Sequence, residues 1–391
     1  MDGWRVSAPR REHRDNAGRL EAAMDLASQL AKEEAAMKSI REETEDAYYQ
    51  AYNSLTFEPQ PGEPSRGKNV AFVVHAASLL AHVQLMRGVL RRQDYVIVLS
   101  GSAEGFRNLL PATVICLPDV PLADRFEAMR DRLKANQIGT LIWVSLPLYA
   151  RYAFGLRLAE KQVFWAMRYH PIAPGDLNIT AGNRGEKTRT FHGKEWACVH
   201  APFNVELKRV DKVRCENQRA PYSYIYGTLA REQKLSPEYL EAVAAILHAH
   251  SEAGFVWTGR QERPPVRQFF RTKGLSNRQW FAGWVDPDDF VNTLDCFIET
   301  FPLGGLTTFT AMGHGIPVVA MRQEHSPVGS IDAHQGLLAA SGHDEYVRMA
   351  LSMQDRAKRQ AAVEAGHRAL HLEIAAAEKD RQQFWRVIQS Q

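Results

Sequence analysis

The chain has 391 residues, of which 45% are hydrophobic and 24% are charged, and this is the composition of an ordinary globular protein. A chain of this length exceeds what one hydrophobic core usually serves, so two domains joined by a linker are expected. Its 48 basic and 45 acidic residues leave a formal net charge of only +3, and the basic residues are scattered, which argues against a nucleic-acid-binding surface.

The cysteines and the apolar stretches point to a cytoplasmic protein. The four cysteines lie far apart without CxxC spacing, and three of them lie in or beside apolar runs, which predicts buried free thiols rather than a zinc site. They are Cys116, Cys198, Cys215 and Cys296. The first residues, "MDGWRVSAPRREHRDN", lack the apolar core of a signal peptide. The longest hydrophobic stretch, 140–159, is interrupted by Arg151 and Arg157, so no membrane span is expected.

Residues 1–67 form a predicted helical extension and a linker. Apolar residues recur at helical spacing through 14–57, beginning with Leu20 and Met24. The following "FEPQPGEPSRGK" contains three prolines and two glycines, which is typical of a linker. We expect the helices to pack on the rest of the chain or on a second copy, which would allow self-association, and docking of another protein is the less favoured interpretation.

Residues 68–207 and 208–370 each predict a Rossmann-like domain. Short apolar runs such as "NVAFVVH", "DYVIVLSG" and "TLIWVSL" in the first part, and "YSYIYG", "GFVWTG" and "IPVVAM" in the second, alternate with helical segments. Runs of this kind are typical of parallel strands buried on both faces. The expected fold is therefore α/β, with two Rossmann-like domains facing a cleft, and a C-terminal helix over 371–391 that packs back on the first domain.

The stretch "FPLGGLTTFTAMGHGIPVVA" joins a buried strand to a short helix and then to another strand. Glycines allow close backbone approach to a ligand, and the first N–H groups of a helix have no intrahelical partners. Such a loop can bind a phosphate, helped by the hydroxyls of Thr307 and Thr308. The competing interpretation is a tight turn in which Thr307 only caps the helix.

The segment "FIETFPLGGLTTFTAMGHGIPVVAMR" resembles the nucleotide-sugar signature of GT-B fold glycosyltransferases. It is most similar to the family that contains the protein O-GlcNAc transferases and the bacterial cytoplasmic protein N-glycosyltransferases. The segments "YGTLAREQKLSPEYLEAVAAILHAHSEAGFVWTG", "NRQWFAGWVDPDDFVNTLDCF" and "LAEKQVFWAMRYHP" also resemble parts of this family, so the resemblance spans residues 69–329.

The resemblance implies roles for individual residues around a donor substrate. Lys234 would contact the diphosphate, Thr307 and Thr308 would hold phosphate oxygens, and Gly259 would line the base pocket. The remaining implied donor-binding residues are Gly304, Gly305, Arg231 and Gln162. Many GT-B enzymes have an acidic residue that binds the ribose on the helix after the glycine-rich loop. Thr310 occupies that position here, so the sequence offers there neither an acidic ribose contact nor the glutamate that a retaining mechanism would use.

A histidine is the expected catalytic base for an inverting transfer. The segment after the first strand holds a histidine in several GT-B families, and His82 matches that position best, followed by His75 and then His170. No DxD-type metal motif lies in a strand-end loop, since "DPDD" at 286–289 is typical of a helix start. Metal-independent donor binding without a cofactor is therefore expected.

These patterns predict a cytoplasmic, inverting, hexosyltransferase-like glycosyltransferase. It would use a nucleotide diphosphate sugar, with UDP favoured, and its acceptor would be a protein side chain or, less favoured, a lipid- or saccharide-linked hydroxyl. Two alternatives stay open. A nonhydrolysing UDP-sugar epimerase shares the double Rossmann layout, and a degenerate GT-B protein would act as a binding or scaffolding partner.

Overall fold

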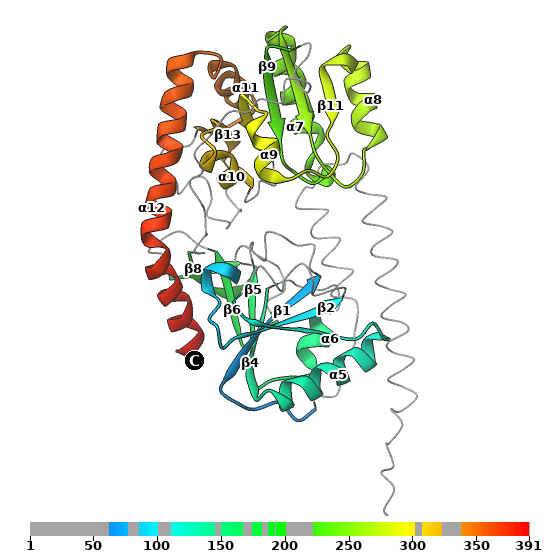
Figure 1. Ribbon diagram of the computed structural model, residues 1–391, viewed down its shortest axis with the longest axis vertical. Helices are drawn as coiled ribbons and strands as arrows, with labels where there is room; N and C mark the ends of the chain where they lie inside the picture. Colours follow the sequence, from blue (N-terminus) through cyan, green and yellow to red (C-terminus); the bar gives the residue numbers. More distant parts are fainter. Residues whose placement is uncertain are drawn as a thin grey trace, which may run out of the picture.

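The computed structural model shows two mainly parallel sheets, one above the other along the long axis of the molecule, with helices around them (Figure 1). The structure describes residues 62–76, 86–100, 111–144, 150–166, 174–181, 187–191, 193–200, 222–301, 307–322 and 338–390. The helical extension expected over 14–57 lies outside the described residues.

The first sheet has eight strands in the order β3-β2-β1-β4-β5-β6-β8-β7. Neighbouring strands are parallel except for β7 and β8, which form an antiparallel pair at one edge. The elements are β1 (Asn69–Ala76), β2 (Tyr95–Ser100), β3 (Thr113–Cys116), α5 (Leu122–Ala135), β4 (Ile138–Trp143), α6 (Ala150–Gly155), β5 (Lys161–Ala166), β6 (Leu177–Ala181), β7 (Thr188–Phe191) and β8 (Lys194–Val199). Because β2 and β3 extend the sheet on one side of β1 and β4 begins the other side, the chain order reverses between β1 and β4.

The second sheet has six strands, all parallel, in the order β11-β10-β9-β12-β13-β14. The elements are β9 (Tyr224–Thr228), η2 (Glu232–Lys234), α7 (Pro237–Ala249), β10 (Ala253–Trp257), α8 (Pro264–Thr272), η3 (Ser276–Arg278), β11 (Gln279–Phe281), α9 (Pro287–Asn292), β12 (Cys296–Ile298), α10 (Thr307–Gly313), β13 (Val318–Met321), β14 (Leu338–Ala340), α11 (His343–Ser352) and α12 (Arg356–Gln389). Here the chain order reverses between β9 and β12.

Both sheets are covered on both faces, which explains the near-continuous apolar runs in the sequence. Ile142 and Trp143 are neighbours in β4, so their side chains point to opposite faces, and both are fully buried in different apolar clusters. Phe297 and Ile298 do the same in β12. The α/β architecture with two Rossmann-like sheets agrees with the prediction.

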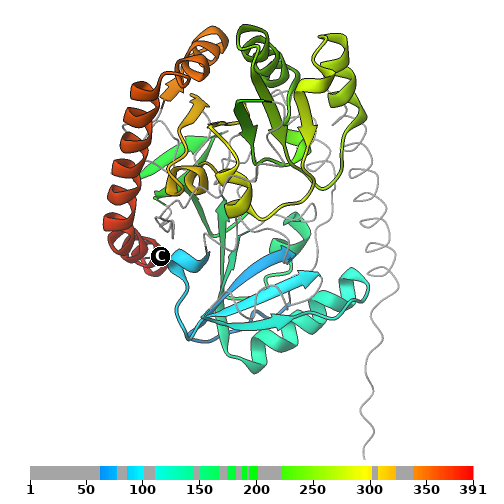
Figure 2. The same ribbon diagram turned by 45° about the horizontal axis from the view of Figure 1, so that its top comes forward.

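Helix α12 runs beside both sheets and joins the two halves of the molecule (Figures 1 and 2). Near its middle Leu370 shares an apolar cluster with Met312 of α10. Towards its end, Trp385 donates a hydrogen bond of 2.9 Å from Nε1 to the carbonyl of Val89, and the ring of Phe384 lies 4.6 Å from that of Trp165 in β5. The carboxyl-terminal half of α12 is therefore part of the core of the first sheet.

The structure differs from the sequence-based expectations in three details. The boundary expected at residue 370 falls inside the continuous helix α12. Cys116 is exposed rather than buried, because it ends β3 at the edge of the sheet, whereas Cys198 and Cys296 are buried. The pair β7–β8 extends the first sheet beyond the strands recognised from their apolar runs.

Among the described helices, none combines the length and the apolar character needed to cross a membrane.

Candidate functional site

The carboxyl ends of the strands in the second sheet carry most of the predicted donor-binding residues. Parallel strands end at the same edge of a sheet, and ligands of such folds bind at that edge, next to the point where the chain order reverses. In the second sheet this point lies between β9 and β12, so the loops that follow these two strands flank the expected binding position.

The loop after β9 brings two cationic side chains to this edge. It contains Arg231, which is exposed, and Lys234, which is half-buried at the end of the short helix η2. Ser236 then caps α7, because its side-chain oxygen accepts a hydrogen bond of 3.1 Å from the N–H of Tyr239. The same hydroxyl donates a bond of 2.8 Å to the carbonyl of Phe301, just after β12. The two loops that flank the reversal point are thus tied together directly.

The loop after β10 is locked onto the loop after β9. The carboxylate of Glu232, in η2, accepts a hydrogen bond of 3.0 Å from the N–H of Arg260. A Cβ atom on Gly259 would lie 2.5 Å from Oε2 of Glu232, so any larger residue there would displace the carboxylate. The N–H of Gly259 also donates a 3.2 Å bond to the carbonyl of Gly283, which adds the loop after β11 to the same assembly.

Cations and one exposed aromatic ring surround this assembly. The indole of Trp284 is 61% exposed, and the guanidinium of Arg260 lies 5.6 Å from its centre. Arg263 donates a hydrogen bond of 3.4 Å to the carbonyl of Glu232. Burial lowers the pKa of the Arg263 guanidinium, while the charge of Glu232 acts in the opposite direction. Together with Arg231 and Lys234, these groups can attract an anion and offer a flat surface to a planar ring.

Helix α10 begins at Thr307 beside this edge. The side chain of Thr307 is half-buried, whereas Thr308 is fully buried and donates its hydroxyl hydrogen to Oε1 of Glu299 over 2.5 Å. The hydroxyl hydrogen of Thr308 is therefore engaged with Glu299, which leaves the half-buried Thr307, the first residue of α10, as the remaining threonine candidate. Gly304 and Gly305 lie outside the described residues.

Thr310 lies on α10 and is half-buried, and its carbonyl accepts a bond of 3.1 Å from the N–H of His314. No carboxylate occupies that helix position.

The first sheet contains one predicted catalytic residue within the described ranges. His75 is the last but one residue of β1, so its backbone lies at the carboxyl edge of the sheet, next to the reversal between β1 and β4. His82 and His170 lie outside the described residues. The structure therefore places one candidate base position at the expected edge.

Gln162, which the resemblance implies as a donor-binding residue, does not lie at the carboxyl edge of the first sheet. It is the second residue of β5, near the amino end of that strand, and it is fully buried. Its side-chain amide donates a bond of 2.7 Å to the carbonyl of Phe154, and its N–H donates one of 2.8 Å to Asp176. These contacts give Gln162 a structural role in the first domain. Its place near the amino end of β5 sets it at the opposite end of the strand from the carboxyl edge.

Ligand-type side chains gather at one further position among the described residues. His200, Glu373 and Asp380 are all buried where the end of β8 meets α12, with 2.7 Å between Nε2 of His200 and a carboxylate oxygen of Glu373. The acidic run "DPDD" is the start of α9, as expected, because Asp286 accepts bonds from the N–H groups of Asp288 and Asp289.

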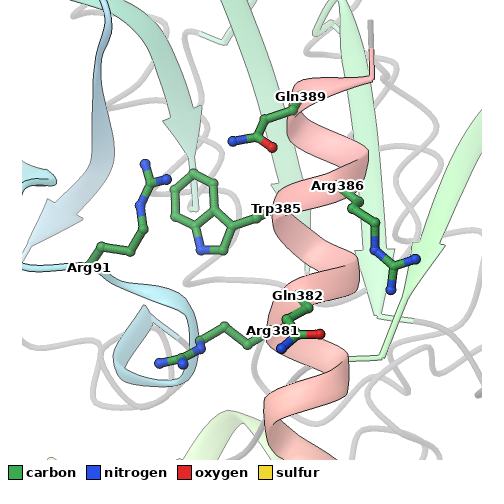
Figure 3. Close-up of a pocket in the computed structure, with 6 residues that line it drawn as sticks. All are labelled: Arg91, Arg381, Gln382, Trp385, Arg386 and Gln389. Carbon is green, nitrogen blue, oxygen red and sulfur yellow. The ribbon is translucent and has the colours of Figure 1, made fainter.

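A surface pocket of about 420 Å³ lies at the end of α12, and six residues line it (Figure 3). The residues that line this pocket are Arg91, Arg381, Gln382, Trp385, Arg386 and Gln389. The guanidinium of Arg91 lies 3.5 Å from the centre of the Trp385 ring and forms a salt bridge with Asp94. Both Arg91 and Asp94 lie just before β2, which begins at Tyr95. This pocket therefore opens near the amino end of β2, at the other end of the sheet from the expected binding edge.

Known proteins resemble this chain both in the sequence of the second domain and in the fold. Residues 220–353, which contain the whole edge described above, match the family of glycosyl transferases group 1. The matched residues lie in the second domain, so the match covers about a third of the chain. The whole chain has the GT-B fold.

Solved structures of the same fold share little sequence with the chain. An O-GlcNAc transferase mutant from Thermobaculum terrenum is 17% identical, over 95% of this chain and 81% of that protein, with a TM-score of 0.64. HepE from Anabaena, solved with UDP and glucose, is 14% identical over 83% of this chain and 100% of that protein, with a TM-score of 0.60. A glycosyltransferase from Rickettsia africae is 10% identical over the same shares, with a TM-score of 0.61. No curated protein matches the chain by sequence.

Several residues of this edge were not recognised from the sequence. Glu232, Glu299 and Trp284 lie within the segments that resemble the family, but the resemblance assigned them no role. A charged side chain in the loop of a recognised motif was the one available signal for Glu232.

Proposed function

We propose that this GT-B protein transfers a sugar from a nucleotide diphosphate sugar to an acceptor, with UDP as the favoured nucleotide. The observation that supports this most is the pairing of loops at the reversal point between β9 and β12. The loop that carries Lys234 and the loop that leads to Thr307 are joined there by the bond from Ser236 to Phe301. HepE, which shares the fold, was solved with UDP and glucose.

The proposed chemistry follows from the charge that develops on the departing diphosphate. Lys234 and Arg231 would neutralise this charge, and Thr307 with the backbone at Gly304 and Gly305 would donate hydrogen bonds to the phosphate oxygens. Since cations and fixed donors can supply this stabilisation, donor binding would not require a metal. Thr310 provides no carboxylate for the ribose, so the proposal contains no acidic ribose contact on α10.

We propose an inverting transfer in which a histidine of the first domain removes the proton of the acceptor. His82 is the first choice, with His75 and His170 after it. The acceptor would be a protein side chain, with a lipid- or saccharide-linked hydroxyl as second choice, and the reaction would take place in the cytoplasm.

Incubation of the full chain with radiolabelled UDP-, GDP- and dTDP-sugars, with and without EDTA, tests this proposal. We expect one donor to be hydrolysed or transferred, and EDTA to leave the rate unchanged. Interconversion of the sugar without release from the nucleotide would instead support an epimerase. Nucleotide binding without any turnover would support a binding or scaffolding role, and no binding at all would contradict the proposal.

A further inference from the structure

Glu232 has an unusual position for an acidic residue, because it lies inside the cationic edge that would bind an anion. It is only 7% exposed, and it shares the short helix η2 with Lys234. Arg263 lies against it, and Arg231 precedes it directly. A negative charge at this position would repel a diphosphate through space. Its presence therefore calls for a physical role that outweighs this repulsion.

The contacts of Glu232 indicate what this role is. Its carboxylate accepts a hydrogen bond of 3.0 Å from the N–H of Arg260, and its carbonyl accepts one of 3.4 Å from Arg263. A parallel bond of 3.2 Å runs from the hydroxyl of Thr258 to the carbonyl of Ala230. Two loops from neighbouring strands are thus joined at three points, and Glu232 takes part in two of them, one through its carboxylate and one through its carbonyl.

The joined loops carry the two halves of the proposed donor site. One loop holds Lys234, which would contact the diphosphate. The other holds Gly259 and Arg260, next to Trp284, where the base would lie. A Cβ atom at Gly259 would approach Oε2 of Glu232 to 2.5 Å, so the carboxylate also fixes how closely the loops meet. The distance between the diphosphate contacts and the base contacts depends on this junction.

We propose that Glu232 is a positioning residue for nucleotide binding, which holds the loop of Gly259 and Arg260 in register with the loop of Lys234. The inference rests on the proposed function, since it assigns the two loops to one donor nucleotide. The inference predicts the direction in which nucleotide affinity changes. Removal of the carboxylate should weaken nucleotide binding, although removal of a negative charge near an anion would by itself strengthen it.

Glu232→Met and Glu232→Gln form the test, with UDP binding measured by calorimetry. Methionine keeps the length of the side chain but accepts no strong hydrogen bond, whereas glutamine keeps an oxygen for the N–H of Arg260. We expect Glu232→Met to raise the dissociation constant for UDP at least about tenfold, as loss of a hydrogen bond to a charged group does. For Glu232→Gln we expect a dissociation constant for UDP within about threefold of that of the wild type.

Equal or tighter UDP binding by Glu232→Met would overturn the inference, because only repulsion would then have been removed. A lower melting temperature with unchanged UDP affinity would also overturn it, since that result describes a purely structural residue. If Glu232→Met does not fold, Gly259→Ala tests the same junction by steric displacement, and unchanged UDP affinity in that variant would overturn the inference. Wild-type protein that binds UDP separates these outcomes from failure of the proposed function, which would appear as no binding by the wild type.

Discussion

Replacement of Ser236 by alanine should weaken both the second domain and its affinity for UDP. The hydroxyl of Ser236 is buried and makes two bonds, one from the N–H of Tyr239 and one to the carbonyl of Phe301. Loss of a helix cap costs about 1 kcal/mol. Loss of the second bond, which leaves a buried carbonyl without its partner, costs about 1 kcal/mol more. The free energy of unfolding should therefore fall by about 2 kcal/mol, which lowers the melting temperature of a domain of this size by roughly 4–8 °C.

Differential scanning calorimetry and UDP titration of the same preparations measure both effects. Because Ser236 ties the loop of Lys234 to the end of β12, we expect the dissociation constant for UDP to rise by at least about threefold. Asp355→Ala is the matched control, since Asp355 caps α12 through the N–H groups of Ala357 and Lys358. That variant should lose stability and keep its UDP affinity. An unchanged melting temperature in Ser236→Ala, or an unchanged UDP affinity at a lowered melting temperature, would refute the reasoning.

Three further predictions concern single side chains. Lys234→Ala should raise the dissociation constant for UDP by at least about tenfold and leave the melting temperature unchanged, because the side chain supplies charge; equal affinity in titration calorimetry would contradict this. Burial and the neighbouring Arg278 lower the pKa of His250 below its ordinary value of 6.5, so unfolding takes up a proton in this range. Stability should therefore decline as the pH falls through 6.5 towards the folded pKa, and urea denaturation of His250→Gln should show a smaller decline. Burial raises the pKa of the Cys296 thiol, whereas Cys116 is exposed, so mass spectrometry after brief alkylation should find the label on Cys116 and not on Cys296.

The sequence was sufficient for the architecture, because local patterns determine it. Parallel strands that are buried on both faces leave continuous apolar runs, such as those of β4 and β12, and these runs need no partner to be recognised. The start of α7 is also a local feature, since Ser236 caps the helix and Pro237 is its first residue.

The details of the site depend on contacts between distant residues. The carboxylate of Glu232 meets the N–H of a residue 28 positions later, and that of Glu299, directly after β12, meets the hydroxyl of Thr308 in α10. Neither pairing can be seen in the sequence. Gln162 resembled a donor-binding residue by its motif, but the position along β5 decides which edge it reaches. The pair β7–β8 was missed because β7, with Thr188 and Arg189, lacks the apolar run of a central strand.

A crystal structure of the full chain with UDP tests the central claim most directly. The account predicts that the diphosphate lies between the loop of Lys234 and the start of α10 at Thr307, with the base beside Gly259 and Arg260. UDP bound elsewhere, for example in the arginine-lined pocket at the end of α12, would contradict the assignment of the donor site to the carboxyl edge between β9 and β12.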